Sequence, residues 1–287
     1  MGYPEAEDGE AVRQLLTAFV LAISVVLARA QGVDEDVRFA VIGDNGTGDD
    51  AQYAVGRQMA SARATFPYNL VLMLGDNLYR RASPEVYASA FERPYQALLD
   101  AGVMFVAVLG NHDSPESVRY PRWNMNGRRY FTFTRGHVRF FAIDTNLLDA
   151  EQLDWLGRAL GEAREPWKIA YFHHPIYSNG KRHGSNVELR VRLEPLFVQH
   201  GVQVVFSGHD HFYERLKPQK GITYFVAGAG GQLRRGGVER SETSAVVFAD
   251  DQSFMLVEVT RQSLRFRAIA RSGTVIDSGA VERQPSS

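Results

Sequence analysis

The sequence predicts an α/β fold: a four-layer α/β/β/α sandwich of two packed mixed β-sheets flanked by helices. Two observations support this prediction. Strand-like and helical segments alternate through the first two thirds of the chain, whereas the last third is mostly strand-like. In addition, five strongly apolar runs each end at a polar, metal-capable side chain, which is typical of the carboxyl ends of strands in open α/β sheets. With 287 residues, 45% of them hydrophobic, the chain can bury a full core.

Local signals define the expected elements in chain order. Ser83 and Pro84 offer an N-cap and a first-turn proline for one helix, and Arg135-Gly136 forms a turn between two strands. The expected helices cover residues 50–66, 83–99, 151–163 and 186–200. The expected strands cover residues 37–43, 70–75, 103–109, 129–134, 137–143, 169–172, 202–206, 222–226, 254–260 and 263–270.

Composition excludes several classes of function. The formal net charge is −1 and no run of lysines and arginines occurs, so we expect no nucleic-acid partner. Cysteine is absent, which excludes disulfides, thiolate ligands and a cysteine nucleophile. Any metal site must therefore use nitrogen and oxygen ligands.

The N-terminus resembles an export signal. Residues 15–28 are apolar, and the Ala-Arg-Ala sequence at residues 28–30 fits a cleavage site before Gln31. The apolar run is shorter than a membrane span of about 20 residues. Residues 1–10 carry four acids and no base, unlike an ordinary signal peptide, which initiation further along the chain would explain. We expect residues 1–30 to be cleaved from a secreted or periplasmic protein with no stable membrane span; a membrane anchor or a packed N-terminal helix are the alternatives.

Candidate metal ligands follow the apolar runs. They are Asp44, Asp76, Asn111, His173, His209 and His211. A carboxylate that bridges two metal ions must be held rigidly, and Asp76 at a strand end suits that role. A two-metal hydrolytic site explains this pattern best.

The histidines differ in what their spacing predicts. His209 and His211 lie two apart, so in an extended segment both point to one side and can contact neighbouring metals. His173 and His174 are adjacent and should face opposite ways. We expect His173 to be the ligand and His174 to make a supporting hydrogen bond. His137 and His200 are expected to be structural or solvated.

Five ordered motifs together resemble the calcineurin-like metallophosphoesterase superfamily and, within it, the purple (tartrate-resistant) acid phosphatases. They are Asp44-x-Gly46, Gly75-Asp76-x-x-Tyr79, Gly110-Asn111-His112-Asp113, His173-x-Pro175 and Gly208-His209-x-His211. The resemblance covers about residues 37–271 and implies a single catalytic domain over residues 31–287.

The resemblance also implies the metals. Most of the superfamily has Asp-x-His in the first motif, but here the third position is Gly46, and Tyr79 replaces the lost ligand. Phenolate is a hard anionic donor, so the tyrosine-containing site is expected to hold Fe(III). Its ligands would be Asp44, Asp76, Tyr79 and His211. The second site would hold Fe(II), Zn(II) or Mn(II) through Asp76, Asn111, His173 and His209.

The implied reaction is hydrolysis of a phosphate monoester by attack of a metal-bound hydroxide. Asp76 and His112 are the expected catalytic residues, with His112 as the general acid that Asp113 could orient. Asn111 and His183 are expected to contact the substrate, although Lys181 or Arg182 could serve in place of His183.

Two other functions remain open on sequence alone. A phosphodiesterase or nucleotide hydrolase would use the same metal core and differ in loops 115–127 and 178–186. A non-catalytic metal-binding module would normally have lost a ligand or His112, and neither is missing. The expected partner is a small-molecule phosphate ester, and the chain is expected to be a monomer.

Overall fold

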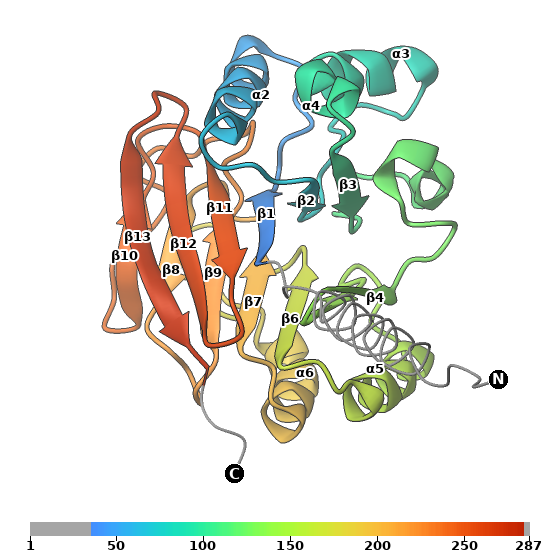
Figure 1. Ribbon diagram of the computed structural model, residues 1–287, viewed down its shortest axis with the longest axis vertical. Coiled ribbons are helices and arrows are strands. Elements are labelled where there is room, and N and C mark those ends of the chain that lie inside the picture. Colours follow the sequence, from blue (N-terminus) through green and yellow to red (C-terminus); the bar gives the residue numbers. More distant parts are fainter. Residues whose placement is uncertain (1–35, 284–287) are drawn as a thin grey trace, which may run out of the picture. The chain divides into compact units, whose positions relative to one another are not determined.

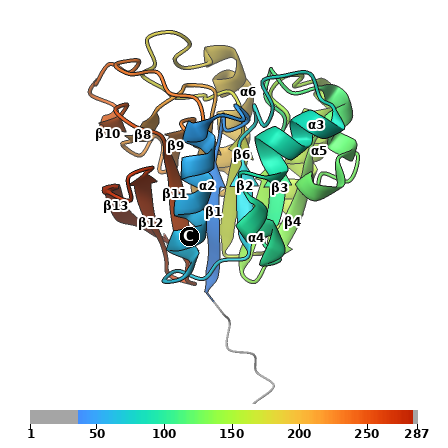
Figure 2. The same cartoon turned by 90° about the horizontal axis from the view of Figure 1, so that it is seen from above.

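A computed structural model describes residues 36–283, which build two mixed β-sheets with helices outside them (Figures 1 and 2). The predicted α/β/β/α fold class is confirmed. The expected signal peptide at residues 1–30 lies outside the described residues.

The first sheet contains six strands in the order β13-β12-β11-β1-β2-β3. Strands β1, β2 and β3 run parallel, whereas β11 pairs with β1 antiparallel and continues into the antiparallel pairs with β12 and β13. The strand bounds are β1 (Val37–Ile42), β2 (Leu70–Met73), β3 (Met104–Ala107), β11 (Ser253–Val259), β12 (Ser263–Ala270) and β13 (Val275–Glu282).

The second sheet contains seven strands in the order β10-β8-β9-β7-β6-β5-β4. Its centre, from β5 through β6 and β7 to β9, is parallel, and both edges are antiparallel. The strand bounds are β4 (Phe131–Arg135), β5 (Val138–Ala142), β6 (Trp167–Phe172), β7 (Val204–Ser207), β8 (Tyr213–Leu216), β9 (Thr223–Ala227) and β10 (Ser244–Phe248).

Side-chain caps begin the longer helices. The Asp49 and Asp149 carboxylates accept hydrogen bonds from backbone N–H groups at the starts of α2 and α5, and Asn186 does the same for α6. The helix bounds are α2 (Asp50–Arg63), α3 (Pro84–Tyr87), η1 (Ala88–Glu92), α4 (Gln96–Asp100), η2 (Pro115–Arg119), η3 (Pro121–Trp123), α5 (Ala150–Glu162) and α6 (Val187–His200). None of the helices in this described part of the chain is long and apolar enough to cross a membrane.

The continuous helix expected over residues 83–99 is wrong. The segment divides into α3, the π-helical turn η1 and α4. Pro94 has no N–H to donate to the carbonyl of Ala90, and its ring would clash there in a regular helix. The Ala90 carbonyl instead accepts a hydrogen bond of 2.6 Å from the Gln52 side chain of α2. The break therefore fastens this segment to α2.

Three strands were not predicted: β8, β10 and β13. Each pairs in an antiparallel part of its sheet, and β10 and β13 form edges. The sequence of β13 contains Asp277 and Gly279, which interrupt the alternation expected of a strand. Pairing with β12 decides its conformation.

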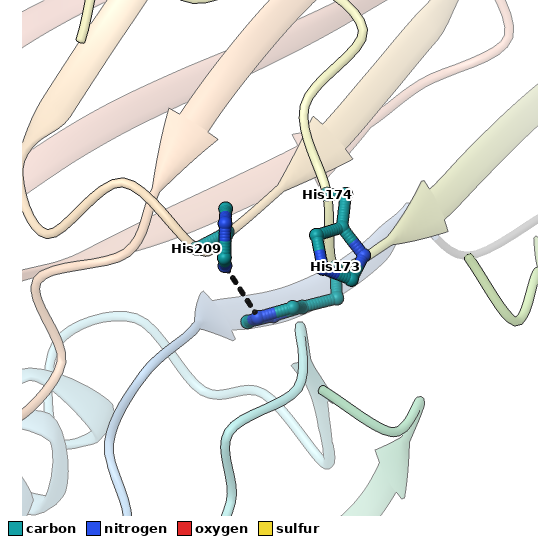
Figure 3. Close-up of side chains that lie close together, drawn as sticks. All are labelled: His173, His174 and His209. Atoms are coloured by element: carbon teal, nitrogen blue, oxygen red, sulfur yellow. Dashed lines mark hydrogen bonds between the residues drawn. The ribbon is translucent and has the colours of Figure 1, made fainter. Parts of the chain in front are cut away.

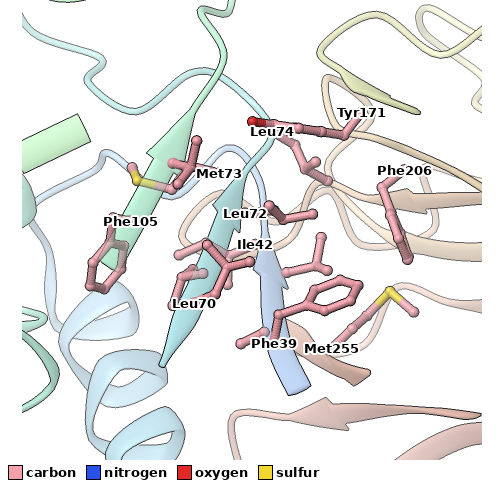
Figure 4. Close-up of a cluster of buried hydrophobic side chains, with 14 of the residues drawn as sticks. Phe39, Ile42, Leu70, Leu72, Met73, Leu74, Phe105, Tyr171, Phe206 and Met255 are labelled. Carbon is pink, nitrogen blue, oxygen red and sulfur yellow. The ribbon is translucent and has the colours of Figure 1, made fainter. Parts of the chain in front are cut away.

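The main hydrophobic core includes the space between the sheets. Phe39 of β1 packs edge-on against Phe140 of β5 and Phe206 of β7, with ring centroids 5.3 and 6.1 Å apart. Figure 4 shows Phe39 and Phe206 within this core. A second core forms where α5 and α6 cover the seven-stranded sheet, with Phe172 of β6 stacked on Phe197 of α6. The packing of aromatic rings thus sets how the sheets face each other.

We expect Phe39→Ala to lower the free energy of unfolding by about 3–5 kcal/mol, because the cavity would lie between both sheets. Denaturant unfolding measures this change. Val191→Ala is the control, since Val191 is 67% exposed on α6 and its loss should change stability by less than about 0.5 kcal/mol. Similar small losses in both variants would contradict the described packing.

Candidate metal centre

The polar residues singled out from the sequence come together where parallel strands of both sheets end. Asp44 and Asp76 follow β1 and β2, and Asn111 follows β3. His173 follows β6 directly, and His209 lies just beyond β7. The grouping of Asp44, Asp76 and His173 brings potential ligand atoms within 4.8 Å of one another.

One group of donor atoms is formed by Asp44, Tyr79 and His211. The Tyr79 hydroxyl lies 3.2 Å from Asp44 Oδ1 and 3.2 Å from His211 Nε2, and the latter two atoms are 3.3 Å apart. Metal–ligand bonds of roughly 2.0–2.2 Å place adjacent ligand atoms about 3 Å apart. The triangle therefore has the dimensions of one face of a metal site.

A second group surrounds His173 Nε2. This atom lies 3.1 Å from Asn111 Oδ1, 3.1 Å from His209 Nδ1 and 3.5 Å from Asp76 Oδ1. The Asp76 carboxylate also interacts with the Tyr79 hydroxyl of the first group. Asp76 thus lies between the two groups, which is the position that a bridging ligand needs.

A backbone carbonyl fixes the tautomer of His173. Its Nδ1 lies 2.9 Å from the carbonyl oxygen of Leu74, which can only accept a hydrogen bond. Nδ1 must then carry the proton, and Nε2 presents its lone pair to Asn111 and Asp76. Metal-binding histidines are commonly oriented in this way.

His174 lies closer to the centre than adjacency predicted. Its Nδ1 contacts the Thr145 hydroxyl at 3.0 Å, in line with the expected supporting hydrogen bond. Its ring centroid is nevertheless 4.8 Å from that of His173 and 4.5 Å from that of His209 (Figure 3). The sequence gives no signal for this, because the turn after β6 decides it.

Three of the proposed ligands have an unusual backbone. Asp44, Asp76 and His209 have φ values of 55°, 51° and 68°, in the left-handed region that side chains rarely adopt. Such conformations cost roughly 1–3 kcal/mol each and cluster at functional sites. Cross-loop hydrogen bonds hold them, including His209 N–H to Asp44 Oδ2 at 2.7 Å.

Gly46 lies directly against the turn that carries Asp76. A Cβ on Gly46 would be 2.1 Å from the carbonyl oxygen of Asn77. No side chain fits at this position, so only glycine allows the two turns to approach this closely. The Tyr79 hydroxyl lies among the donor atoms of the first group.

Electrostatics favour a cation at the centre. Asp44 and Asp76 are 0% and 1% exposed. Burial raises the pKa of both, and mutual repulsion raises that of Asp44 further. Burial also lowers the pKa of His209 to about 2 and that of His211 to about 4, which keeps both imidazoles neutral and able to bind metal.

His112 stands at the mouth of the centre. Its side chain is 51% exposed, its Nε2 is 4.0 Å from Asp76 Oδ2, and its ring packs on Tyr79. Its backbone N–H donates to Asp76 Oδ1 at 2.9 Å. The imidazole is therefore free to reach a group bound above the donors.

Asp113 does not orient His112. Its buried carboxylate accepts hydrogen bonds from the backbone N–H groups of Gly110, Asn77 and Leu78, and from the Asn77 side chain. The contacts with Asn77 and Leu78 fasten the turn beyond β2 to the segment after β3, and the contact with Gly110 lies within that segment. Asp113 supports the backbone around Asp76.

Two cavities adjoin the centre and share His174 and Asn186. The larger, of about 690 Å³, reaches Asn111, and the smaller, of about 490 Å³, reaches His209 and His183. His183 is exposed, and its ring centroid is 4.1 Å from that of His209. The expected substrate contacts, Asn111 and His183, thus line the two ends of one cleft.

Two adjacent groups of donor atoms at the strand ends of an α/β/β/α sandwich are the arrangement that a metal-dependent phosphoesterase uses. The family model for calcineurin-like phosphoesterases matches residues 37–213, and the chain belongs to this family. All the proposed ligands fall within the matched range.

Curated relatives are acid phosphatases, which confirms the resemblance and the predicted class of enzyme, a phosphoric-ester hydrolase. Tartrate-resistant acid phosphatase type 5 of Oryctolagus cuniculus is 28% identical over 254 residues, covering 74% of this chain and 78% of that protein. Purple acid phosphatase 7 of Arabidopsis thaliana is 25% identical over 288 residues, covering 88% of each.

Solved structures share the fold. GAP50, described as the anchor in the inner membrane complex of Plasmodium, gives a TM-score of 0.75 at 19% identity and covers 87% of this chain and 90% of that one. Purple acid phosphatase PPD1 from yellow lupin (Lupinus luteus) seeds gives 0.73 at 18% identity, with 87% and 54% covered. At these identities the likeness concerns the fold alone.

We expect Gly46→Ala to lower the free energy of unfolding by about 1–3 kcal/mol and to reduce the metal content, because the new Cβ would push the Asp44 and Asp76 turns apart. Gly157→Ala on α5 is the matched control, since its Cβ would meet only Leu196 Cδ2, at 3.9 Å. Elemental analysis and thermal unfolding measure both effects. A Gly46→Ala protein with unchanged metal content would refute the close approach.

Proposed function

We propose that this protein is an exported, two-metal acid phosphatase that hydrolyses phosphate monoesters, with residues 1–30 as its cleaved signal. The observation that carries the proposal is the location of Asp76 between two groups of donor atoms, with His112 above it at the mouth. The acid phosphatases among the relatives support the monoester class.

The donor set fits two metal ions of different charge. Asp44, Asp76, Tyr79 and His211 offer up to three anionic oxygens and one neutral nitrogen, which suits Fe(III). Asp76, Asn111, His173 and His209 offer a single anion and three neutral donors, which suits Fe(II), Zn(II) or Mn(II). When bound, the ions would supply an activated water nucleophile and neutralise charge on the phosphoryl oxygens.

Side chains of the protein carry out the other steps, which are proton transfer to the leaving group and binding of the phosphoryl group. His112 donates a proton to the leaving-group oxygen as the ester bond breaks. Asn111 and His183 bind and orient the phosphoryl group from the two ends of the cleft. The buried ligands beneath exclude bulk water from the centre, which strengthens each electrostatic contact.

The Tyr79 assignment predicts a colour. A phenolate bound to Fe(III) absorbs visible light by charge transfer, so Tyr79→Phe should abolish the visible band of the purified protein. Tyr53→Phe is the control, since the hydroxyl of Tyr53, a half-buried residue of α2, donates to the Ser89 carbonyl at 3.2 Å and not to any of the proposed ligands. A visible band that survives in Tyr79→Phe would show that this residue is not the ligand.

The His112 assignment predicts a dependence on the leaving group. General acid catalysis contributes about 10²–10⁴-fold, so His112→Ala should slow alkyl phosphates by this factor and p-nitrophenyl phosphate much less. The bound metals should remain, because the proposed ligand is Asn111. Elemental analysis and steady-state kinetics on both substrates measure this, with His200→Ala at the C-terminal end of α6 as the control.

Equal losses on both substrates would move His112 from acid catalysis to phosphate binding. A diester, bis(p-nitrophenyl) phosphate, is assayed in parallel. Higher kcat/KM for the diester would favour a phosphodiesterase, and no turnover of any ester by the metal-loaded protein would favour a non-catalytic module.

A further inference from the structure

We propose that Thr145 and Asn146 are positioning residues for the metal ion of the second group of donor atoms. They belong to the segment after β5, residues 144–146, which ends at the same edge of the sheets as the proposed ligands. This segment ties together the parts of the chain that carry Asn111 and His173. The inference rests on the proposed two-metal function, and it says that different parts of the chain hold the two metal sites.

Thr145 holds the backbone beside His173. Its hydroxyl oxygen accepts a hydrogen bond from the backbone N–H of His174 at 3.1 Å and lies 3.0 Å from Nδ1 of the same residue. Thr145 is only 7% exposed, so water does not readily replace its hydroxyl. Because His174 follows His173 directly, this contact fixes the backbone from which the proposed ligand extends.

Asn146 holds the end of β3. Its Nδ2 donates to the carbonyl oxygens of Leu109 at 3.1 Å and of Gly110 at 3.3 Å. These carbonyls directly precede Asn111, whose Oδ1 lies 3.1 Å from His173 Nε2. A shift of the Gly110 carbonyl would therefore move Asn111 relative to the imidazole with which it would share the metal.

The two contacts join the two sheets at the second group. Strand β3 is an edge of the six-stranded sheet, and β5 and β6 are neighbours in the seven-stranded sheet. Backbone pairing within either sheet therefore does not set the distance between Asn111 and His173. The His173 bond to the Leu74 carbonyl crosses to the end of β2, and the segment after β5 adds the bond to the end of β3.

The segment after β5 is itself firmly anchored. Asp144, only 2% exposed, accepts hydrogen bonds from the Asn146 N–H at 2.9 Å and from the Arg129 guanidinium at 2.7 Å. The Gln152 side chain of α5 accepts the Asp144 N–H at 2.8 Å and donates to the Asp144 carbonyl at 3.0 Å. A positioning residue needs such a supported backbone, because any looseness in it would pass to the ligands.

The first group of donor atoms is fastened by a different part of the chain, the loop after β9. The Gln232 N–H donates to the Asp44 carbonyl at 2.9 Å, and the Arg234 N–H donates to the His211 carbonyl at 2.8 Å. The hydrogen bonds of the segment after β5 reach neither of these proposed ligands. Loss of those bonds should therefore weaken the second metal site and spare the first.

The test measures zinc affinity separately from the state of the iron site. The full chain is loaded with iron and Zn(II) is titrated against a chromophoric chelator, while iron content and the visible band of Tyr79 report on the first group. Thr145→Val and Asn146→Ala should each raise the Kd for Zn(II) by roughly 10- to 100-fold, the range for loss of a residue that orients a metal ligand. The band should not change. Thr145→Ser keeps the hydroxyl and should stay within about 3-fold.

Asn124→Ala is the matched control. The Asn124 Nδ2 donates to the Phe105 carbonyl at 2.7 Å, which is the same kind of contact on the same strand, away from the proposed ligands. This variant should lower the free energy of unfolding and change the Kd for Zn(II) by less than about 3-fold. Thermal unfolding of all four variants then separates lost stability from lost positioning.

Turnover at saturating zinc separates positioning from substrate contact, because Thr145 and Asn146 also line the cavity of about 690 Å³. A residue that positions the metal acts through the occupancy of its site. Excess zinc should therefore restore kcat for p-nitrophenyl phosphate to within about 3-fold of the unmutated protein in both variants.

Three results would overturn the inference while leaving the phosphatase in place. They are an unchanged Kd for Zn(II) in Thr145→Val and Asn146→Ala, a kcat that excess zinc does not restore, and an equal loss of iron and zinc. If the unmutated protein bound no second metal ion, the proposed two-metal function would fail, and this inference with it.

Discussion

The burial of two carboxylates at the ends of neighbouring parallel strands is the constraint on which this structure depends. Asp44 and Asp76 follow β1 and β2, which pair directly, and both are almost fully removed from water. Each such charge costs several kcal/mol unless an opposite charge compensates for it. Burial lowers the pKa of His209 and of His211, which favours their neutral forms and leaves the two carboxylates without that compensation. A bound cation would supply it and would link metal binding to the stability of this edge.

The packing of the two sheets sets the geometry of the centre, because each sheet supplies only half of it. The first sheet contributes the carboxylates, and the second contributes His173 and His209. Hydrogen bonds cross between these halves, from His173 Nδ1 to the Leu74 carbonyl and from His209 N–H to Asp44. A shift of one sheet against the other would separate these atoms, so the aromatic contacts of Phe39 between the sheets also serve the site.

Sequence reasoning identified the fold class and the polar residues that meet at the strand ends, because apolar strands followed by polar residues are a local signal. Tyr79 and His211, which are 132 positions apart, were paired only through the family resemblance. The break in the helix expected over residues 83–99 had a local signal in Pro94, which that expectation did not use. Two features had no local signal. Strand β13 depends on its pairing with β12. The place of His174 beside both neighbouring rings depends on the turn after β6.

The acidic residues that stand among the ligand motifs have a common physical role. Asp113 follows His112, and Asp210 lies between His209 and His211, yet both carboxylates accept hydrogen bonds from loops. Asp113 fixes the turn that carries Asp76, and Asp210 fixes the loop that carries Arg182 and His183. Each short motif therefore combines donors for the centre with an anchor for a loop beside it. Because both anchoring carboxylates are buried, the proposed ligands and the loops beside them are held by the same backbone. The loop that carries the proposed substrate contact His183 is therefore fixed by the segment that also carries His209 and His211.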